Sequence, residues 1–252
     1  RKAQMNAQTS LQEGLREIDK RIGWRGPIGH REDVHAEDSS RASFSASIGD
    51  ISAGVVMSVN AREAVIRARG IKGRLLLSDA LWASNIINSA SGQTRRIQNL
   101  KLTDILKRGD VVWIRFKSIS GQNVLFSLEQ EPEIEGALSA VDPVTGHIKA
   151  LVGGYSFTKS EFNRAVHAKR QAGSAIKPVI YAGAIEHGFT AASIVNDEPV
   201  SYRWGSGEEW SPKNYDHKYY GPIRLRDALA YSRNIVTVKL MDKVGIDQTM
   251  SV

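Results

Sequence analysis

The stretch Gly173-Ser174-Ala175-Ile176-Lys177-Pro178 opens a segment whose apolar residues recur at helical spacing until Gly188. This spacing predicts a helix of about fourteen residues. Pro178 stands early enough to be tolerated in the first turn, where backbone N–H groups have no intrahelical acceptor. Ser174 and Lys177 are three residues apart, so a helix places them on one face and the amine can reach the hydroxyl.

A serine and a lysine in this arrangement are suited to acyl transfer. The serine hydroxyl is a poor nucleophile and needs a neighbouring base. Lysine is a base only when neutral, which requires its pKa to fall well below the ordinary value of about 10.4. Free N–H groups at the start of a helix would stabilise the oxyanion of a tetrahedral intermediate. A serine at this position is, however, more often only a helix cap.

A second motif strengthens the assignment. Ser232-Arg233-Asn234 follows residues 223–230, whose apolar positions predict another helix that ends near the serine. Two short motifs in this order are more specific than either one alone. The predicted site residues are Ser174, Lys177, Ser232 and Asn234, and we expect neither a cofactor nor a metal ion.

Both patterns also occur where no chemistry is expected. Ser156 and Lys159 repeat Ser-x-x-Lys in a polar stretch without apolar periodicity, so nothing there would hold the lysine dry and oriented. Ser58 and Asn60 repeat Ser-x-Asn inside a predicted strand, where a solvent-facing pair is the simpler interpretation.

The rest of the chain predicts a small barrel between two flanks. Between residues 48 and 128 five short β-type runs alternate with turn residues, which favours a five-stranded OB-like barrel. The runs are 53–59, 64–68, 75–77, 111–116 and 124–128. Upstream, residues 10–20 have the apolar spacing of a helix and residues 30–47 are typical of a connector. Downstream, residues 137–141 and 147–152 flank Asp142-Pro143-Val144-Thr145-Gly146 and predict a hairpin.

Charge is concentrated in the same middle segment. Residues 41–128 hold 13 Lys and Arg against 5 Asp and Glu, which accounts for the net charge of +7. Such a segment fits an anionic partner or simply a solvated surface. The absence of cysteine excludes disulfides, thiolate zinc sites and cysteine nucleophiles. The six histidines lack metal-ligand spacing, and no apolar run reaches the roughly 18 residues of a membrane span, so we expect the chain as given to be soluble.

Further short blocks occur in a family's order. They are Gly23-Trp24-Arg25-Gly26-Pro27, residues 136–143, residues 151–155, Phe162-Asn163-Arg164-Ala165, Lys169-Arg170-Gln171, residues 210–216, Gly221-Pro222 and Leu225-Arg226. With the two motifs, they make nearly the whole chain resemble the class A bifunctional penicillin-binding proteins of the Gram-negative 1A type.

The resemblance implies a role for each site residue. Ser174 would attack the penultimate D-Ala carbonyl of a peptidoglycan stem peptide, release the terminal D-Ala and pass the acyl group to an amine of a neighbouring stem. Lys177 is the implied base, Ser232 would relay a proton between Lys177 and the leaving group, and Asn234 would bind the donor peptide's amide. β-Lactams would acylate Ser174 and stall there.

It also implies an α+β fold: part of a penicillin-binding transpeptidase domain of the serine β-lactamase-like kind, with an inserted all-β OB-like barrel. We expect residues 1–47 to be a linker and the start of the transpeptidase domain, and residues 48–130 to be the inserted OB-like domain. We expect residues 131–252 to be the N-terminal part of the transpeptidase domain, which is incomplete here. The family's Lys-Thr-Gly motif lies beyond Asn234 and is absent here, so we expect this fragment alone to be inactive or weak. Ala172 and Ala175-Ile176 replace residues more common in the family, while keeping size or apolarity.

The implied partners follow the same comparison. They are stem peptides ending in D-Ala-D-Ala, β-lactams bound covalently at Ser174, and an outer-membrane lipoprotein activator that docks on the OB-like domain. The implied location is the periplasmic face of the bacterial inner membrane, to which a single-pass anchor would hold the full-length protein.

Two alternatives stay open. A serine β-lactamase or β-lactam sensor would use the same Ser-x-x-Lys chemistry, but a hydrolase needs a carboxylate that activates water, and no residue is an evident candidate. A non-catalytic OB-fold module could bind single-stranded nucleic acid through aromatic residues and basic charge. We do not expect nucleic acid binding, because most of the barrel's aromatic residues alternate with polar ones as core residues do. These aromatic residues are Trp82, Trp113, Phe116 and Phe126.

Overall fold

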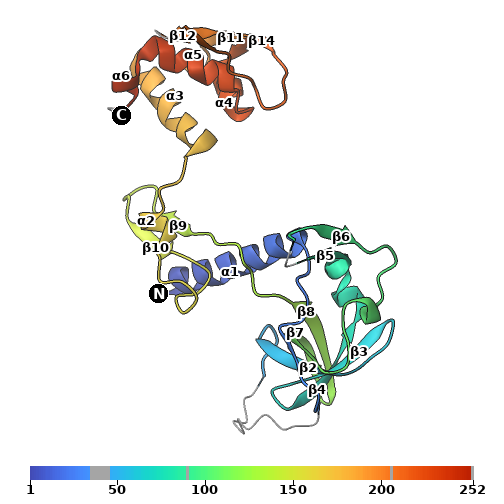
Figure 1. The fold of residues 1–252 in the computed structure, drawn as a ribbon. Coiled ribbons are helices and arrows are strands. Elements are labelled where there is room, and N and C mark those ends of the chain that lie inside the picture. The colour runs from blue at the N-terminus through green and yellow to red at the C-terminus, as the bar shows by residue number, and fades with distance from the viewer. Residues whose placement is uncertain (35–45, 89–90, 205–206, 251–252) are drawn as a thin grey trace. The chain divides into compact units, whose positions relative to one another are not determined.

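The computed structural model describes residues 1–34, 46–88, 91–204 and 207–250. The chain forms two units, residues 1–168 and residues 169–252, and each has its own buried core (Figure 1). The first unit contains α1 (Lys2–Ile22), a barrel, a β-hairpin and the short helix α2 (Arg164–His167). Within the described parts of the chain, no helix is both long enough and apolar enough to cross a membrane.

Five strands close into a barrel, which confirms the OB-like fold. They are β2 (Ile51–Val59), β3 (Glu63–Ala68), β4 (Ile71–Leu76), β7 (Asp110–Ser120) and β8 (Asn123–Glu129). Antiparallel pairs run in the order β8, β7, β2, β3 and β4, and a short parallel pairing of β4 with β8 closes the ring. The short strand β1 (Gly29–His30) pairs with β7. The link from β4 to β7 contains η1 (Leu77–Asp79), η2 (Leu81–Ser84), β5 (Asn85–Ile87), β6 (Thr94–Arg96) and η3 (Leu102–Asp104).

Aromatic residues fill the barrel. Phe116 of β7 and Phe126 of β8 are fully buried and meet edge to face, with ring centroids 5.0 Å apart. Gly73 lies against Phe126, because a Cβ atom there would be 2.5 Å from the ring's Cε2 atom. Trp24, which precedes the first barrel strand, also packs into this core. The two phenylalanines are therefore core residues, as their alternation predicts, and their faces are not open for base stacking.

Helix α1 packs on the hairpin of β9 (Leu138–Val141) and β10 (Ile148–Val152). Ala7 of the helix forms a small core with Ala150 and Val152. The helix is longer than the 10–20 segment expected, because its N-terminal half is also held by this contact. The hairpin turn is organised by Asp142, whose Oδ1 accepts hydrogen bonds from two backbone N–H groups of the turn.

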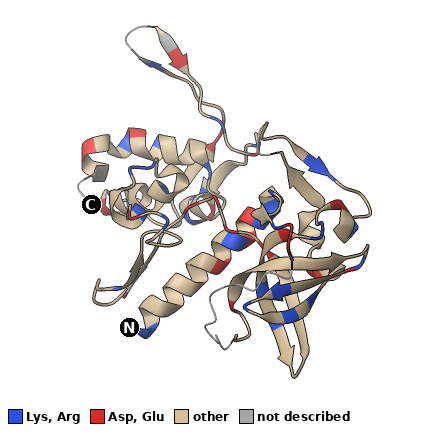
Figure 2. Ribbon diagram, turned by 60° about the horizontal axis from the view of Figure 1, so that its bottom comes forward, with Lys and Arg blue, Asp and Glu red and all other residues tan. Residues whose placement is uncertain are grey.

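Charged side chains join α1 to the barrel. Figure 2 marks the positions of the charged residues along the ribbon. Glu129 at the end of β8 is buried and forms ion pairs with Lys20 at 2.8 Å and with Arg115 at 2.9 Å. Arg115 also reaches Glu13 of α1, with its Nη1 atom 2.7 Å from Oε1. The buried Glu129 carboxylate thus forms ion pairs with Lys20 of the helix and with Arg115 of β7, and these pairs hold the helix against the barrel wall.

The second unit is a group of helices with two small antiparallel sheets. Its elements are η4 (Gly173–Ile176), α3 (Lys177–Glu186), β11 (Ile194–Asp197), β12 (Tyr202–Trp204), β13 (Glu208–Trp210), β14 (Gly221–Arg224), α4 (Leu225–Ala230), α5 (Asn234–Val244) and α6 (Ile246–Met250). Strand β11 pairs with β14, and α3 packs against α5 through apolar residues (Figure 1). Ala228, Val236 and Leu240 are completely buried in this core. The C-terminal end of α4 and the N-terminal end of α5 lie beside the start of α3.

Candidate active site

The predicted nucleophile and base lie at the start of one helix. Ser174 is in the 3₁₀ turn η4, and Lys177 is the first residue of α3. The predicted helix is present, but its first turn is a 3₁₀ helix and the α-helical part is shorter than fourteen residues. Pro178 stands in the first turn of α3, where the missing N–H leaves no intrahelical bond unmade.

Lys177 is buried and has three hydrogen-bond acceptors around its amine. Its side chain enters the gap between α4 and α5, and the residue is 6% exposed. Nζ lies 2.6 Å from the Ser232 carbonyl oxygen, 2.9 Å from Ser232 Oγ and 2.6 Å from Asn234 Oδ1. The structure therefore brings three of the four predicted residues into direct contact.

Ser232 links the lysine to the fourth residue. Its hydroxyl lies 3.2 Å from Ser174 Oγ and 2.9 Å from Lys177 Nζ. The spacing of Ser174 and Lys177 predicts a direct contact, whereas the hydrogen bonds of these described side chains run through Ser232. A hydroxyl can donate and accept, so this serine is able to pass a proton in either direction.

The surroundings of Lys177 favour its neutral form. Burial lowers the pKa of the amine, and the positive charge of Arg233 lowers it further. Ser232, Asn234 and Ser174, which surround the amine, carry no charge to offset these effects. Both causes act in the direction that a catalytic lysine base requires.

A pocket of about 400 Å³ opens in front of the four residues. Besides Ser174, Ser232 and Asn234, it is lined by Asn214, Tyr215, Asp216, Tyr231 and Arg233. Tyr215 is 98% exposed and Tyr231 is 70% exposed. Two exposed phenol rings thus line the same pocket as Ser174. The pocket is hence polar at its floor and aromatic at its rim.

A buried ion-pair network lies behind the pocket. Arg233 Nε is 2.8 Å from Asp197 Oδ2, and Arg233 Nη1 is 3.0 Å from Asp216 Oδ2. Asn214 donates to Asp197 Oδ1 at 2.7 Å. No role for these residues is predicted from the sequence. The one signal was the place of Arg233 between two predicted site residues, since no local spacing connects it with Asp197.

The two repeated patterns have structural roles. The Lys159 amine donates to the Pro132 carbonyl oxygen, and Ser156 Oγ is 2.7 Å from the Thr158 hydroxyl, so the Ser156 and Lys159 side chains do not hydrogen-bond to each other. Ser58 is exposed on β2, and Asn60 Oδ1 accepts hydrogen bonds from two N–H groups of the following turn.

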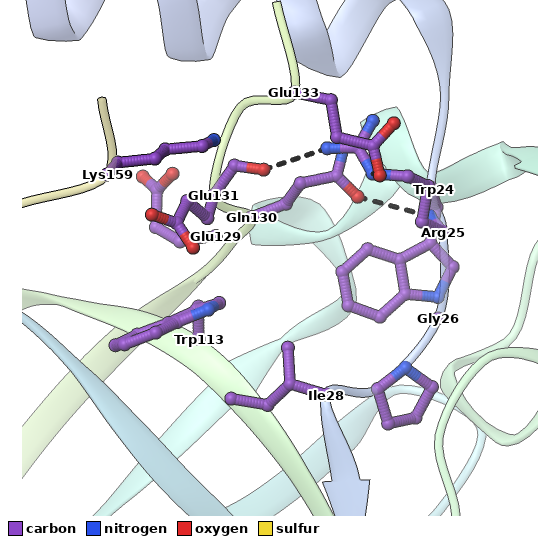
Figure 3. A pocket seen from close by; sticks show the side chains of 11 residues that line it. Trp24, Arg25, Gly26, Ile28, Trp113, Glu129, Gln130, Glu131, Glu133 and Lys159 are labelled. Atoms are coloured by element: carbon purple, nitrogen blue, oxygen red, sulfur yellow. Dashed lines mark hydrogen bonds and ion pairs between the residues drawn. The ribbon is translucent and has the colours of Figure 1, made fainter. Parts of the chain in front are cut away.

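Another pocket, of about 260 Å³, lies in the first unit between the barrel wall and the chain that leaves β8 (Figure 3). Trp24 and Trp113 border it. Its main charged groups already have partners: Arg25 contacts Asp19 and Glu133, and Glu129 is bound by Lys20 and Arg115. Most of the charged groups of this pocket therefore join structural elements to one another. No group of three potential metal ligands occurs among the described residues.

Comparison with known proteins finds two families that together cover most of the chain, and the boundary between them, at residues 134–136, differs from the division of the structure into two units at residue 168. Residues 24–134 match the family of the penicillin-binding protein OB-like domain, and residues 136–252 match that of the penicillin binding protein transpeptidase domain. Penicillin-binding protein 1A of Escherichia coli (strain K12) is 35% identical over 257 residues, which cover 98% of this chain and 29% of that protein. The same protein of Pseudomonas aeruginosa is 34% identical, with 97% and 29% covered.

A solved structure is also similar. The crystal structure of penicillin-binding protein 1A from Haemophilus influenzae has a TM-score of 0.77 and 30% sequence identity to this chain, and the match covers 98% of this chain and 35% of that one. The chain thus spans about a third of the length of these relatives.

Proposed function

The chain belongs to the penicillin-binding proteins, and on this premise we propose that Ser174 is the acylated nucleophile of a peptidoglycan D,D-transpeptidase. The observation that carries the proposal is the chain of contacts from Lys177 Nζ to Ser232 Oγ at 2.9 Å and from Ser232 Oγ to Ser174 Oγ at 3.2 Å. It joins a nucleophile and a relay that line one pocket to a buried base. Nucleophilic acyl transfer needs this set of groups.

The protonation state of Lys177 gives the relay a direction. A neutral amine has two N–H donors and one lone pair. The Ser232 carbonyl and Asn234 Oδ1, each at 2.6 Å, take the two donors. The lone pair then faces the Ser232 hydroxyl. In the structure this hydroxyl donates to Ser174 Oγ, so it first turns its proton to the amine and then accepts the proton of Ser174. The proton of the nucleophile thereby moves through Ser232 to Lys177.

The reaction follows from this arrangement. Ser174 Oγ attacks the penultimate D-Ala carbonyl, and the bond to the terminal D-Ala breaks as that amine takes a proton from Lys177 through Ser232. The Ser174 ester remains until an amine of a second stem peptide attacks it, restores the hydroxyl and forms the cross-link. The Ser174 backbone N–H, at the start of η4, would supply one donor to the oxyanion. A β-lactam would form the same ester.

A hydrolase that releases the acyl group is disfavoured by the carboxylate in the pocket. Among the described residues that line it, Asp216 is the one carboxylic acid, and its Oδ2 is paired with Arg233 at 3.0 Å. The hydrogen bond from the Lys218 N–H, and after it the pairing with Arg233, lower the pKa of Asp216. A serine β-lactamase would need a free base that activates water.

Mass spectrometry of the full-length protein after incubation with a penicillin tests the proposal. We expect a stable adduct on Ser174 that is absent from the Ser174→Ala variant, while Ser156→Ala retains it as a matched control. Turnover of the penicillin without an adduct would favour the hydrolase instead. Labelling that persists in Ser174→Ala would place the nucleophile elsewhere.

The remaining functions concern the whole protein. We propose that it combines transpeptidase with glycosyltransferase activity in cell-wall synthesis and acts at the periplasmic face of the inner membrane through an anchor outside these 252 residues. We further propose that the OB-like domain docks an outer-membrane lipoprotein activator. The basic excess of residues 41–128 supports a docking role with an acidic partner.

A further inference from the structure

The backbone at Ser232 adopts a conformation that needs outside support. Its φ is 53°, in the left-handed region that residues with a Cβ atom seldom occupy. This conformation directs both the Ser232 carbonyl, at 2.6 Å, and its hydroxyl, at 2.9 Å, to Lys177 Nζ. In an ordinary conformation the amine would lose at least one of these partners. Such a conformation persists only where neighbouring contacts enforce it.

The neighbour that supplies the strongest contacts is Arg233. Its side chain is 4% exposed, and all three guanidinium nitrogens are bound: Nε to Asp197 at 2.8 Å, Nη1 to Asp216 at 3.0 Å, and Nη2 to the Lys218 carbonyl. The Tyr220 ring covers the guanidinium, with the Cζ atom 4.4 Å from the ring centroid. Because the planar guanidinium is bound through all three nitrogens and covered by a ring, it restrains the Arg233 backbone.

The same network holds the next residue. Asp197, fully buried on β11, accepts from Asn214 Nδ2, and Asn214 Oδ1 accepts from the Asn234 backbone N–H at 2.8 Å. The Asn234 side chain donates to the Lys213 carbonyl at 2.9 Å, which leaves its Oδ1 for Lys177. Arg233 and Asn234, which follow Ser232, are therefore both held by hydrogen bonds to β11 and to residues 213–220.

The charges of the network also bear on Lys177. Arg233 is the cation whose field acts on the amine, and both carboxylates of the network, Asp197 and Asp216, are paired with it. The other groups around the amine are the neutral Ser174, Ser232 and Asn234. Loss of the guanidinium would remove a positive charge and release two negative ones, and both changes favour protonated lysine.

We propose that Arg233 is a positioning residue of the transpeptidase site, whose clamp between Asp197 and Asp216 fixes the Ser232 turn and aims Ser232 and Asn234 at Lys177. The inference rests on the proposed role of Ser174. Arg233 lines the pocket, but its side-chain hydrogen bonds go to Asp197, Asp216 and Lys218 and none goes to Ser174 or Lys177. It therefore acts through Ser232 and Lys177.

The test measures the rate of Ser174 acylation by a fluorescent penicillin across pH, in the full-length protein. We expect Arg233→Gln to acylate about 100-fold more slowly, because small misplacements of catalytic groups have effects of that order. The acid side of its pH-rate profile should also move to higher pH, since Lys177 then keeps its proton longer. Arg233→Lys keeps the charge without the fork, so it should remain slow while its pH profile returns toward that of the parent. Arg226→Gln, at an exposed arginine of α4, is the matched control and should behave as the parent does.

The outcomes separate positioning from folding. Acylation of Arg233→Gln at the parental rate would overturn the inference. So would an unmoved pH profile combined with a loss of rate that is proportional to the loss of folded protein. If Arg233→Gln does not fold, the double variant Asp197→Asn, Arg233→Gln removes the unpaired buried charge. That variant should fold and still acylate slowly, and a parental rate would again overturn the proposal. Absence of any Ser174 adduct in the parent would instead contradict the proposed function, and this inference with it.

Discussion

At the scale of the residue, the Lys177 amine carries the proposed base function. Its pKa is lowered by burial first and by Arg233 second. Below that pKa the amine is protonated and has no lone pair for the Ser232 hydroxyl. We therefore expect acylation to slow as pH falls through a midpoint that lies below the ordinary lysine value of about 10.4. A profile with no acid limb attributable to this group, in a stopped-flow assay with a fluorescent penicillin, would exclude Lys177 as the base.

Lys177→Arg sharpens the same test. The guanidinium stays protonated at every accessible pH, so it can donate to Ser232 and Asn234 but cannot accept a proton. We expect a loss of acylation of about 100-fold or more, in the range that general base catalysis contributes. Lys239 is a partly buried residue of α5 that does not line the pocket, so Lys239→Arg is the control that makes the same exchange elsewhere. Acylation of both variants at the parental rate would contradict the proposal.

Ser232 allows its hydroxyl to be separated from its backbone. Both Ser232→Gly and Ser232→Ala remove the relay, so both should acylate slowly. Glycine adopts the φ of 53° without strain, whereas alanine does not, and we expect the glycine variant to be the more stable by about 1 kcal/mol. Urea unfolding of the two variants measures the difference. Equal stabilities would mean that the left-handed turn is not retained.

The grouping of the four site residues was predictable because Ser174 and Lys177 stand at the start of one predicted helix and Ser232 and Asn234 follow the end of another. Local spacing places Ser174 beside Lys177, and Ser232 beside Asn234. The network behind them was not predictable in this way, because Arg233 meets Asp197 across 36 positions and only the pairing of distant elements brings them together. The predicted direct hydrogen bond between the Ser174 and Lys177 side chains is not formed for a related reason. Ser232, from another part of the chain, hydrogen-bonds to both of them.

At the scale of the element, the barrel strands show close packing around Gly73. A Cβ atom there would lie 2.5 Å from Phe126 Cε2 and 2.8 Å from the Val124 carbonyl. Since Phe126 is fully buried and cannot move aside, we expect Gly73→Ala to lower the free energy of unfolding by about 1–3 kcal/mol. Gly14→Ala in α1 is the matched control, because open space surrounds that position.

The control has a predicted direction of its own. Alanine in a helix interior is favoured over glycine by about 1 kcal/mol, so Gly14→Ala should raise the stability of the first unit. Thermal melts monitored by circular dichroism distinguish the two substitutions. A Gly73→Ala variant that melts with the parent would contradict the packing described for Phe126.

The barrel strands were predictable and the helix α5 was not, and the difference is physical. The strands alternate buried and exposed residues, which is the signature of a sheet with one face inside a barrel. Helix α5 opens with Ile235, Val236 and Thr237, whose branched side chains favour strands. It forms a helix because Ile235, Val236 and Leu240 are completely buried against α3 and α4, so packing outweighs local preference.

At the scale of the whole molecule, charge separates the barrel from the rest of the chain. The basic excess lies between residues 41 and 128. Some of these cations serve the fold, as Arg115 does in binding Glu13 and Glu129. Others are exposed and have no ionic partner among the described residues: Arg62, Lys72, Arg95, Arg96, Lys101, Lys107 and Arg108. The first unit therefore presents cations that form no ion pair among the described residues, whereas Arg233, Asp197 and Asp216 beside the proposed acyl-transfer site are paired.

The proposed activator docking depends on these free cations. Arg95 and Arg96 are neighbours on the exposed strand β6, and reversing both charges with Glu should weaken binding of a purified outer-membrane lipoprotein activator by about tenfold, or roughly 1.4 kcal/mol. The reason is that rim charges attract an acidic partner and are screened by salt, so the affinity of the parent should also fall as ionic strength rises. Isothermal titration calorimetry with the full-length protein measures both effects.

Two controls decide where the docking surface lies. The double variant Arg1→Glu, Lys2→Glu makes the same change in charge at the start of α1, where acidic residues are well tolerated, and should bind the activator normally. Ser174 acylation should be unchanged in both double variants, because the cations of β6 lie outside the unit that contains the site. Parental affinity in Arg95→Glu, Arg96→Glu and in a variant lacking residues 48–128 would show that the barrel does not dock the activator. Weakened binding in the first variant, with normal acylation, would assign docking to the barrel and acyl transfer to the helices.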